Sequence, residues 1–576
     1  MIKARITAEN PEANLRDYDR FYQSFSWSDI EKEFTWHETG KINIVHEAID
    51  RWAEDPDKQH RTALIYEKSG NVQTYSYLDL KEKSCQWANL LAGYGFDSGE
   101  RLFIYLPSCP EMYFAILGCA RMGVLFSPLF STLTFDEIEE RLENARPRGI
   151  LTNSDLCEGL PPETVKQIAH IFIIEGPLPG IFANEELIEG MPEKMQSQFS
   201  TRWVKSETPL YLLYTSGSTG PPKGVVHAHR DMAGHLLTAR YVLDFRQDTI
   251  FWTDSEPSWV TGTVYGMFAP WLCGSTTVVQ GDPFSASNWY RTLEKHRIAV
   301  WYTTPFTLRR LIDAGEDLVS RYDFSQLRHI AVVGEALAPE LIYWVRKNLK
   351  LTPHDTWWMT ETGMICLANF PSMDIKPGSM GKPVPGVEAV IVDENGNPLP
   401  PMTMGQLALK PGWPAMMTEI WLDRERYRAY FKSKGWLLTG DMAVKDEDGY
   451  YYHQGRTDDL IKAGVKLIGP YEIERVLYRH PAVNEAAVIS KGVRLGEPFL
   501  KAFITVKKGY VPSARLNQEL KAYVMANLSS EIALKEIAFI DGIPKTRSGK
   551  LLRRALRTQE LGLPIGDPFN IKEDRK

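Results

Sequence analysis

Short apolar runs alternate with longer segments of helical hydrophobic pattern between residues 62 and 350. Apolar runs of this length, bounded by polar residues, are typical of buried strands. The strands predicted in this way are residues 62–66, 101–105, 149–152, 171–174, 209–213, 299–302 and 329–333. Predicted helices include residues 111–122 and 339–350, the second of which starts with proline, as many helices do. Strands that alternate with helices indicate an α/β fold with parallel sheets.

The pattern changes after residue 387. Residues 387–393, 405–410 and 450–454 have the pattern of strands joined by turns rich in Gly, Pro and Asp. Helix and strand patterns resume at Ile473 and continue to about Leu561. A chain of 576 residues is too long for one hydrophobic core, so we expect two or more domains.

Composition excludes several classes of protein. Hydrophobic residues make up 43% of the chain and charged residues 24%, which is typical of a soluble globular protein. The net charge of −7 gives no general attraction to nucleic acid or to an anionic membrane. The most apolar stretch, residues 113–130, is interrupted by Arg121 and Pro128, which favours a packed helix and a strand over a membrane span. Residues 1–20 lack the apolar core of a signal peptide and the six cysteines lack a CxxC spacing, so we expect a cytoplasmic protein with reduced cysteines.

The segment of greatest chemical interest follows the predicted strand 209–213. Residues 214–224 read Tyr-Thr-Ser-Gly-Ser-Thr-Gly-Pro-Pro-Lys-Gly. Such a loop can direct backbone N–H groups, hydroxyls and an ammonium toward a polyphosphate, and its glycines allow close approach of the backbone. In the common nucleotide P-loop the lysine is followed by Ser or Thr, whereas Lys223 is followed by Gly224. The spacing therefore indicates a different phosphate chemistry, with a polar surface loop as the alternative.

This loop resembles the phosphate loop of the adenylate-forming enzymes, which include acyl-CoA synthetases, peptide-synthetase adenylation domains and luciferases. Four further segments resemble motifs of that superfamily in the expected order: residues 355–363, 438–441, 455–459 and 544–550. Within the superfamily the chain is most similar to short-chain acyl-CoA synthetases of the acetyl-CoA synthetase type. Residues 36–41, residues 259–262 and the pair Trp357-Trp358 carry this closer match.

The resemblance implies a reaction in which ATP activates a carboxylic acid as acyl-AMP and coenzyme A then takes the acyl group. Substrate, ATP and transition state are all anionic, so cations and N–H donors must gather at the site. Lys550 would bridge the attacking carboxylate and the α-phosphate, Thr360 would contact the α-phosphate, and Glu361 would ligate Mg²⁺. The residues implied in binding ATP and AMP are Thr215, Ser216, Gly217, Ser218, Thr219, Lys223, Gly334, Glu335, Ala336, Asp355, Thr356, Trp357, Asp441 and Arg456.

The acyl pocket and the coenzyme A region are also implied by the resemblance. Trp358 would form the floor of a pocket sized for acetate or propionate, because its indole fills much of the available volume. The other residues implied in this pocket are Val260, Thr261, Gly262 and Val333. Asp458 takes the hinge position, so we expect a large N-terminal domain of layered sheets and helices at 1–457 and a smaller mobile α+β domain at 458–576.

The coenzyme A region departs from the usual pattern. Relatives have Ser-Gly-x-Arg after the hinge, whereas this chain has Gly464, Val465, Lys466 and Leu467. A leucine cannot contact phosphate as an arginine does, and a lysine nearby lacks the planar guanidinium fork. Smaller departures are Ala336 in place of proline and Ser258 in place of glycine.

Three alternatives to an acetate-activating ligase remain at this stage. One is a synthetase for another small acid, such as propionate or a branched or cyclic acid. Another is a non-catalytic AMP-binding module, which needs neither Lys550 nor Glu361. The basic cluster of residues 545–554 could instead bind nucleic acid, but the negative net charge and the lack of interleaved aromatic residues argue against it. Lys550 also takes the position at which related synthetases are acetylated, which implies a lysine acetyltransferase and a deacetylase as partners.

Overall fold

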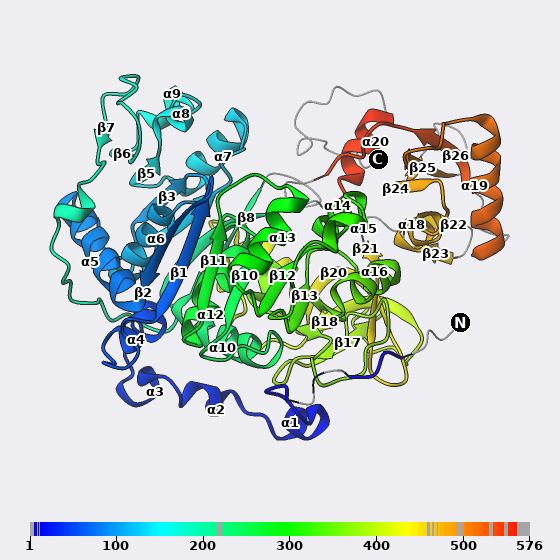
Figure 1. Ribbon diagram of the computed structural model, residues 1–576, viewed down its shortest axis with the longest axis horizontal. Coiled ribbons are helices and arrows are strands. Elements are labelled where there is room, and N and C mark those ends of the chain that lie inside the picture. Colours follow the sequence, from blue (N-terminus) through cyan, green and yellow to red (C-terminus); the bar gives the residue numbers. More distant parts are fainter. Residues whose placement is uncertain are drawn as a thin grey trace.

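The computed structural model describes residues 5–8, 10, 12–215, 222–457, 461–463, 466–468, 470–491, 499–528, 534–545 and 551–560. A large body of sheets and helices carries a smaller unit, drawn in orange and red, at one side (Figure 1). Two long mixed sheets form the centre of the large body. The α/β fold with a large N-terminal and a smaller C-terminal part is thus the architecture predicted from the sequence.

The first sheet has nine strands and is parallel from β14 to β1, with antiparallel strands at both edges. Its order is β16 (Lys382–Pro383), β15 (Leu367–Ala368), β14 (Pro353–Trp357), β13 (His329–Val332), β12 (Val300–Thr303), β10 (Ile250–Thr253), β11 (Thr276–Gln280), β1 (Thr62–Lys68) and β2 (Asn71–Ser76).

The second sheet has eight strands and is parallel from β8 to β7. Its order is β19 (Glu419–Ile420), β9 (Lys223–Ala228), β8 (Pro209–Thr215), β4 (Leu125–Leu129), β3 (Arg101–Tyr105), β5 (Gly149–Thr152), β6 (His170–Ile173) and β7 (Glu185–Leu187). An antiparallel sheet completes the large body with β17 (Ala389–Val392), β18 (Met404–Leu409), β20 (Leu437–Lys445) and β21 (Tyr451–Arg456).

Helices lie on both sides of the nine-stranded sheet. Along β12 the side chains alternate, with Trp301 packed toward helices α13, α14 and α16 and with Val300 and Tyr302 packed toward the opposite face. Because both faces are covered, the strands are continuous apolar runs, as the sequence pattern predicted.

The helices of the large body are α1 (Tyr18–Ser24), α2 (Trp27–Glu31), α3 (Thr35–Thr39), η1 (His46–Asp50), α4 (Arg51–Ala53), α5 (Tyr77–Gly93), α6 (Pro110–Met122), α7 (Phe135–Ala145), α8 (Ser154–Cys157), α9 (Pro162–Val165), η2 (Pro192–Lys194), η3 (His229–Asp231), α10 (Met232–Tyr241), α11 (Val260–Thr263), η4 (Val264–Phe268), α12 (Ala269–Leu272), α13 (Ala286–Lys295), α14 (Pro305–Asp313), α15 (Glu316–Val319), α16 (Pro339–Leu349), η5 (Thr360–Thr362) and α17 (Arg424–Ala429).

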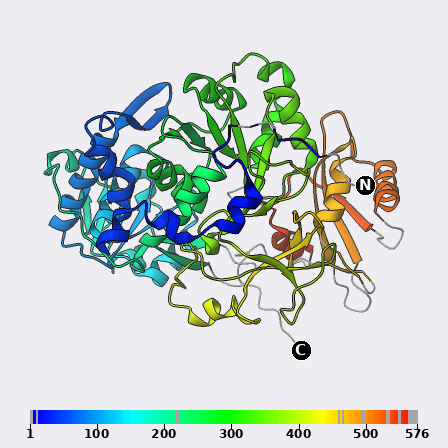
Figure 2. The same ribbon diagram turned by 90° about the horizontal axis from the view of Figure 1, so that it is seen from below.

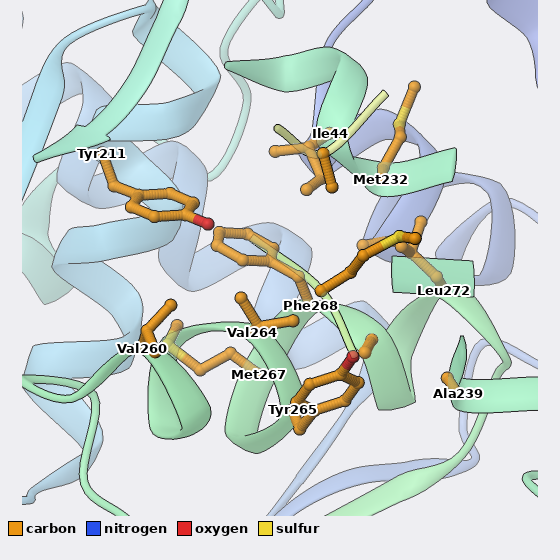
Figure 3. Packing of buried hydrophobic residues seen from close by; sticks show 14 of the residues in the cluster. Ile44, Tyr211, Met232, Ala239, Val260, Val264, Tyr265, Met267, Phe268 and Leu272 are labelled. Carbon is orange, nitrogen blue, oxygen red and sulfur yellow. The ribbon is translucent and has the colours of Figure 1, made fainter. Parts of the chain in front are cut away.

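One buried cluster joins the two large sheets. Side chains of the helical segment α11–η4, including Val264 and Phe268, pack near Tyr211 of β8 (Figure 3). The same cluster contains Tyr302 of β12, so the segment connects the two sheets through a common core. This packing supports the end of β8, where the predicted site residue Thr215 lies.

The most apolar stretch of the sequence is a packed helix followed by a strand, as predicted. Helix α6 begins with Pro110 and ends before Gly123, whose φ of +73° suits glycine. Strand β4 follows it in the eight-stranded sheet. Within the described part of the chain, no helix combines the length and the apolar character needed to cross a membrane. All six cysteines are free thiols, and five of them are buried.

The N-terminal helices α1 to α3 cross the underside of the large body (Figure 2). They are attached at both ends of their path, for example by the Tyr18 hydroxyl, which donates to the Pro383 carbonyl over 2.8 Å. Tyr22 makes the same kind of bond to the Val387 carbonyl over 2.9 Å. These contacts connect the N-terminal segment to the region between the nine-stranded and four-stranded sheets.

The smaller unit has a buried core of its own, built from residues such as Ile473, Ile504 and Leu520. It contains α18 (Pro470–Tyr478), β24 (Val483–Lys491), β25 (Phe499–Val506), α19 (Ala514–Asn527), β26 (Leu534–Phe539) and α20 (Arg553–Glu560), and the two-stranded sheet of β22 (Ile461–Ala463) and β23 (Lys466–Ile468) precedes it. Arg479 of this unit donates to Glu340 of α16 over 3.2 Å. The boundary between residues 457 and 458 stays a prediction, since residues 458–460 lie outside the described part of the chain.

Candidate active site

The predicted phosphate loop connects two antiparallel strands of the eight-stranded sheet. Strand β8 ends at Thr215 and β9 begins at Lys223, and these two residues are partners in the strand register. The hydroxyl of Thr215 is buried and makes no hydrogen bond with any residue that the structure describes. A hydroxyl and an ammonium therefore stand at the two ends of the loop. Ser216, Gly217, Ser218 and Thr219 lie outside the described residues.

Lys223 contacts the predicted magnesium ligand directly. Its ammonium forms an ion pair with Glu361 and a hydrogen bond with the hydroxyl of Tyr430. Tyr430 in turn donates to Glu361 Oε1 over 2.6 Å. Burial raises the pKa of the Glu361 carboxyl, but the Lys223 ammonium and the Tyr430 hydroxyl outweigh burial and bring that pKa down to about 2. Glu361 is therefore an ionised carboxylate with only 4% of its surface exposed, a suitable ligand for a hard cation.

Replacing Lys223 with methionine should lower the free energy of unfolding by about 3 kcal/mol near pH 7, because Glu361 is then a buried carboxylate without its cation. The pKa of Glu361 lies below its ordinary value of 4.5, so this carboxylate stabilises the fold above pH 4.5, and the contribution is lost as the pH falls toward 2. The difference between the unsubstituted protein and Lys223→Met, measured by urea unfolding, should shrink over the same range.

The double variant Lys223→Met with Glu361→Gln is the matched control. It removes both charges together, so it should be more stable than Lys223→Met alone. A Lys223→Met protein that unfolds like the unsubstituted protein at neutral pH would contradict the account of this pair.

Asp441, predicted to bind ATP and AMP through the ribose, is held by two other predicted site residues. The Trp357 indole donates to Asp441 Oδ2 over 2.8 Å, and the Arg456 guanidinium donates to Oδ1 over 2.9 Å. Asp441 and Arg456 are partners in the register of β20 and β21. Strand β21 thus continues through Arg456, two residues beyond the predicted strand, and brings this side chain to the site. The contacts join the segments 355–363, 438–441 and 455–459 in one place.

Gly334, Glu335 and Ala336, predicted to bind ATP and AMP, follow the carboxyl end of β13. Gly334 has a φ of +101°, and a Cβ there would lie 3.2 Å from the Trp259 ring, so the position suits glycine. The next residue, Glu335, pairs with Arg309 of α14. The amide of Leu337, one residue beyond Ala336, donates to Asp355 Oδ2 over 3.3 Å. Burial raises the pKa of the Asp355 carboxyl well above its usual value, while the hydrogen bonds from the Leu337 and Thr356 amides act in the opposite direction.

Two tyrosines that were not predicted as site residues fix the position of Trp358. Its indole N–H donates to the Tyr302 hydroxyl over 3.0 Å, and Tyr265 packs edge-on with ring centroids 5.1 Å apart. The Tyr302 hydroxyl also lies 2.7 Å from Thr356 Oγ1, which donates to the Val332 carbonyl. Thr356, expected in the nucleotide site, therefore connects β14 to β13 and supports Trp358.

The remaining predicted acyl-pocket residues are buried in the same core. Val260 and Val333 belong to the cluster that contains Trp358. The Thr261 hydroxyl is buried without a hydrogen-bond partner in the described part of the chain, which leaves a polar group for a ligand. A Cβ on Gly262 would lie 2.0 Å from the Glu256 carbonyl, so only glycine fits against that turn.

Several predicted residues of the C-terminal part cannot be placed. Lys550, Asp458, Gly464 and Val465 lie outside the described residues. The backbone of Lys466 forms the start of β23. The roles of these residues stay predictions.

Comparisons with known proteins find relatives that match nearly the whole chain. The family model "AMP-binding enzyme" matches residues 50–421, and the model "AMP-binding enzyme C-terminal domain" matches residues 472–550. An acetyl-coenzyme A synthetase of Bacillus subtilis is 43% identical over 573 residues, covering 99% of each chain. One of Pasteurella multocida is 35% identical over 91% of this chain and 85% of its own length.

Solved structures of similar shape are also acyl-CoA ligases. An anthranilate CoA ligase in complex with anthranoyl-AMP has a TM-score of 0.84 and 27% identity, covering 93% of this chain and 99% of its own. An acyl-CoA synthetase of Brucella canis has a TM-score of 0.75 and 27% identity, covering 95% of this chain and 99% of its own.

Proposed function

Because the chain belongs to the AMP-binding enzyme family, we propose that it ligates a short-chain carboxylic acid, most favourably acetate, to coenzyme A. ATP is converted to AMP and pyrophosphate in the process. The observation that carries this proposal is the set of contacts Lys223–Glu361 and Trp357–Asp441–Arg456. They bring a phosphate-binding cation, a metal-binding carboxylate and a ribose-binding carboxylate from separate motifs into one site.

In the first half-reaction an oxygen of the acid attacks the α-phosphorus of ATP. A new carbon-oxygen-phosphorus linkage forms as the bond to pyrophosphate breaks. Lys223 and Thr215 bind the β- and γ-phosphates, and Asp441 accepts hydrogen bonds from the ribose hydroxyls. Glu361, ionised and buried, is suited to hold Mg²⁺, which supplies charge neutralisation to the phosphates when bound. Thr360 contacts the α-phosphate, and Lys550 neutralises the charge that develops there.

In the second half-reaction the thiol of coenzyme A attacks the acyl carbonyl and AMP departs. Lys550 must leave the site before the thiol can approach, so residues 458–576 turn about a hinge at Asp458. The segment of Gly464, Val465 and Lys466 borders the path of the thiol. Acetylation of Lys550 by a lysine acetyltransferase removes the charge that the first half-reaction needs, and a deacetylase restores it.

Replacing Leu467 with arginine should change the coenzyme A step more than the first half-reaction, because the guanidinium restores a phosphate contact that leucine cannot make. The measurement compares the KM for coenzyme A with the rate of pyrophosphate exchange in the same preparation. Leu467→Lys is the matched control, since it adds a charge without the planar fork. Equal effects of Leu467→Arg on both half-reactions would contradict this assignment.

A panel of linear, branched and cyclic acids tests the substrate class. Consumption of coenzyme A and formation of AMP are measured for each acid at equal concentration. We expect the highest kcat/KM for acetate, a lower value for propionate and steep losses beyond it, since one methylene changes binding by about 1–3 kcal/mol. If kcat/KM is highest for a branched or cyclic acid, that acid replaces acetate as the proposed substrate. A protein that binds AMP and turns over none of the acids would be a non-catalytic module.

A further inference from the structure

The turn that carries Glu361 is held through four successive carbonyl groups. It is the 3-10 turn η5, closed by Gly363 with a φ of +66°. The donors come from two separate parts of the chain: His227 Nε2 to the Thr360 carbonyl (2.7 Å), Met417 N to the Glu361 carbonyl (3.0 Å), Trp413 Nε1 to the Thr362 carbonyl (2.8 Å) and His235 Nε2 to the Gly363 carbonyl (3.1 Å). The backbone of the predicted metal ligand is therefore fixed at each residue of the turn.

His227 connects this turn to the phosphate hairpin. It lies four residues after Lys223 on β9, so both side chains project from the same face of the strand. Its Nδ1 lies 2.6 Å from Asp231 Oδ2, and both side chains are fully buried. The imidazole also stacks on Tyr211, with ring centroids 4.8 Å apart. A carbonyl oxygen only accepts hydrogen bonds, so Nε2 carries the proton that is donated to Thr360.

The groups packed around His227 allow its imidazole ring only one orientation. A Cβ on Gly363 would lie 1.9 Å from the Ala415 carbonyl and 2.7 Å from His227 Cε1. The imidazole thus fills the space that the absent side chain of Gly363 leaves. Asp231, Tyr211 and Gly363 together fix the orientation of the ring, and the ring fixes the Thr360 carbonyl.

We propose that His227, oriented by Asp231, is a positioning residue that fixes the turn bearing Glu361 and thereby sets the affinity of the site for metal-bound ATP. The inference rests on the proposed function, in which Glu361 holds Mg²⁺. Groups that orient a metal ligand typically change metal affinity by about 10- to 100-fold when they are removed. AMP has no β- or γ-phosphate and is bound without metal, so in the proposed function it uses this turn only through the contact of Thr360 with its α-phosphate, while Asp441 on β20 binds its ribose.

Two substitutions of His227 separate its two hydrogen bonds. The amide nitrogen of glutamine can take the place of Nε2, so His227→Gln retains a donor for the Thr360 carbonyl. The amide of asparagine takes the place of Nδ1, so His227→Asn retains the contact with Asp231 and loses the one with Thr360. The two variants differ in which partner remains.

Calorimetry would measure two ligands in the absence of acid: Mg²⁺-bound α,β-methylene ATP, and AMP without metal. For His227→Asn we expect the Kd of the triphosphate to rise about 10- to 100-fold and the Kd of AMP to rise by a smaller factor, because AMP shares the Thr360 contact but needs no metal. The Kd of the triphosphate in His227→Gln should be closer to that of the unsubstituted protein than the Kd in His227→Asn is. Unchanged triphosphate binding in His227→Asn, or an equal loss of both ligands, would overturn the proposal.

His329→Asn is the matched control for loss of the Nε2 hydrogen bond of a buried histidine. His329 is 2% exposed and its Nε2 donates to the Val242 carbonyl over 3.1 Å, at the end of β13 away from Gly334. This variant should lower the thermal unfolding midpoint and leave both Kd values unchanged. A weakening of triphosphate binding in the control equal to that in His227→Asn would also overturn the proposal, because it would trace the effect to stability alone.

If His227→Asn does not fold, the isosteric variant Asp231→Asn tests the proposal in its place. It exchanges the carboxyl partner of Nδ1 for an amide, which forms a weaker hydrogen bond, and it keeps the size of the side chain, so the triphosphate should bind more weakly and AMP should be affected less. An unchanged Kd for the triphosphate would then overturn the proposal. The proposed function fails separately, if the unsubstituted protein binds metal-bound ATP and activates no acid.

Discussion

Replacing Glu361 with glutamine should slow acid-dependent exchange of pyrophosphate into ATP by about two to three orders of magnitude, the usual effect of removing one preorganised group that stabilises charge in the transition state. The amide keeps the volume and the bond from Tyr430 but cannot act as an anionic ligand for the cation at the phosphates. The loss should fall mainly on kcat and on the Mg²⁺ concentration at half-saturation. Exchange rates measured over a Mg²⁺ series give both quantities.

Glu47→Gln is the matched control for this experiment. Glu47 is 1% exposed and accepts hydrogen bonds from the backbone and hydroxyl of Thr35. Like Glu361→Gln, Glu47→Gln therefore replaces one oxygen of a buried, hydrogen-bonded carboxylate with nitrogen. Its exchange rate should equal that of the unsubstituted protein. A Glu361→Gln protein that exchanges pyrophosphate at the full rate would remove Glu361 from the reaction.

Replacing Trp358 with glycine should shift the preferred acid from acetate toward butyrate or longer acids. Removal of the indole opens space for added methylenes, each of which is worth about 1–3 kcal/mol in an apolar pocket. The ratio of kcat/KM for butyrate to that for acetate should therefore rise by at least about 100-fold for the two added methylenes. Steady-state kinetics on acetate, propionate, butyrate and hexanoate measure this ratio.

Tyr302→Phe is the graded companion of that variant. It keeps the ring but deprives the Trp358 indole of its acceptor, so the indole loses one of the two contacts that fix it. The butyrate-to-acetate ratio should rise, but by less than in Trp358→Gly. An unchanged ratio in Trp358→Gly would show that another residue limits the length of the acid.

The sequence predicted the parallel strands and the family well because their signals are local. Residues 329–333 form an apolar run, and β13 occupies His329–Val332. The family match confirms the resemblance drawn from the five segments. The motif segments also identified both residues of the pair Lys223–Glu361 as site residues, although the hydrophobic pattern alone does not predict that they are in contact.

Contacts between distant residues could not be predicted. Tyr430 donates to Glu361 from 69 positions away and lies in a segment without a recognisable motif. His227 donates to the Thr360 carbonyl from 133 positions away. Periodicity indicates that a residue is buried, but the partner is set by how the sheets pack. Trp357, which the resemblance implied in binding ATP and AMP, is buried and donates a hydrogen bond to Asp441.

Exchange of labelled pyrophosphate into ATP, in the absence of coenzyme A, would show whether the protein forms an acyl-AMP intermediate with the help of Lys550. We expect exchange that requires both acetate and Mg²⁺, proceeds without coenzyme A, and nearly stops in Lys550→Ala. Absence of acid-dependent exchange in the unsubstituted protein, or exchange at the full rate in Lys550→Ala, would contradict the proposed mechanism.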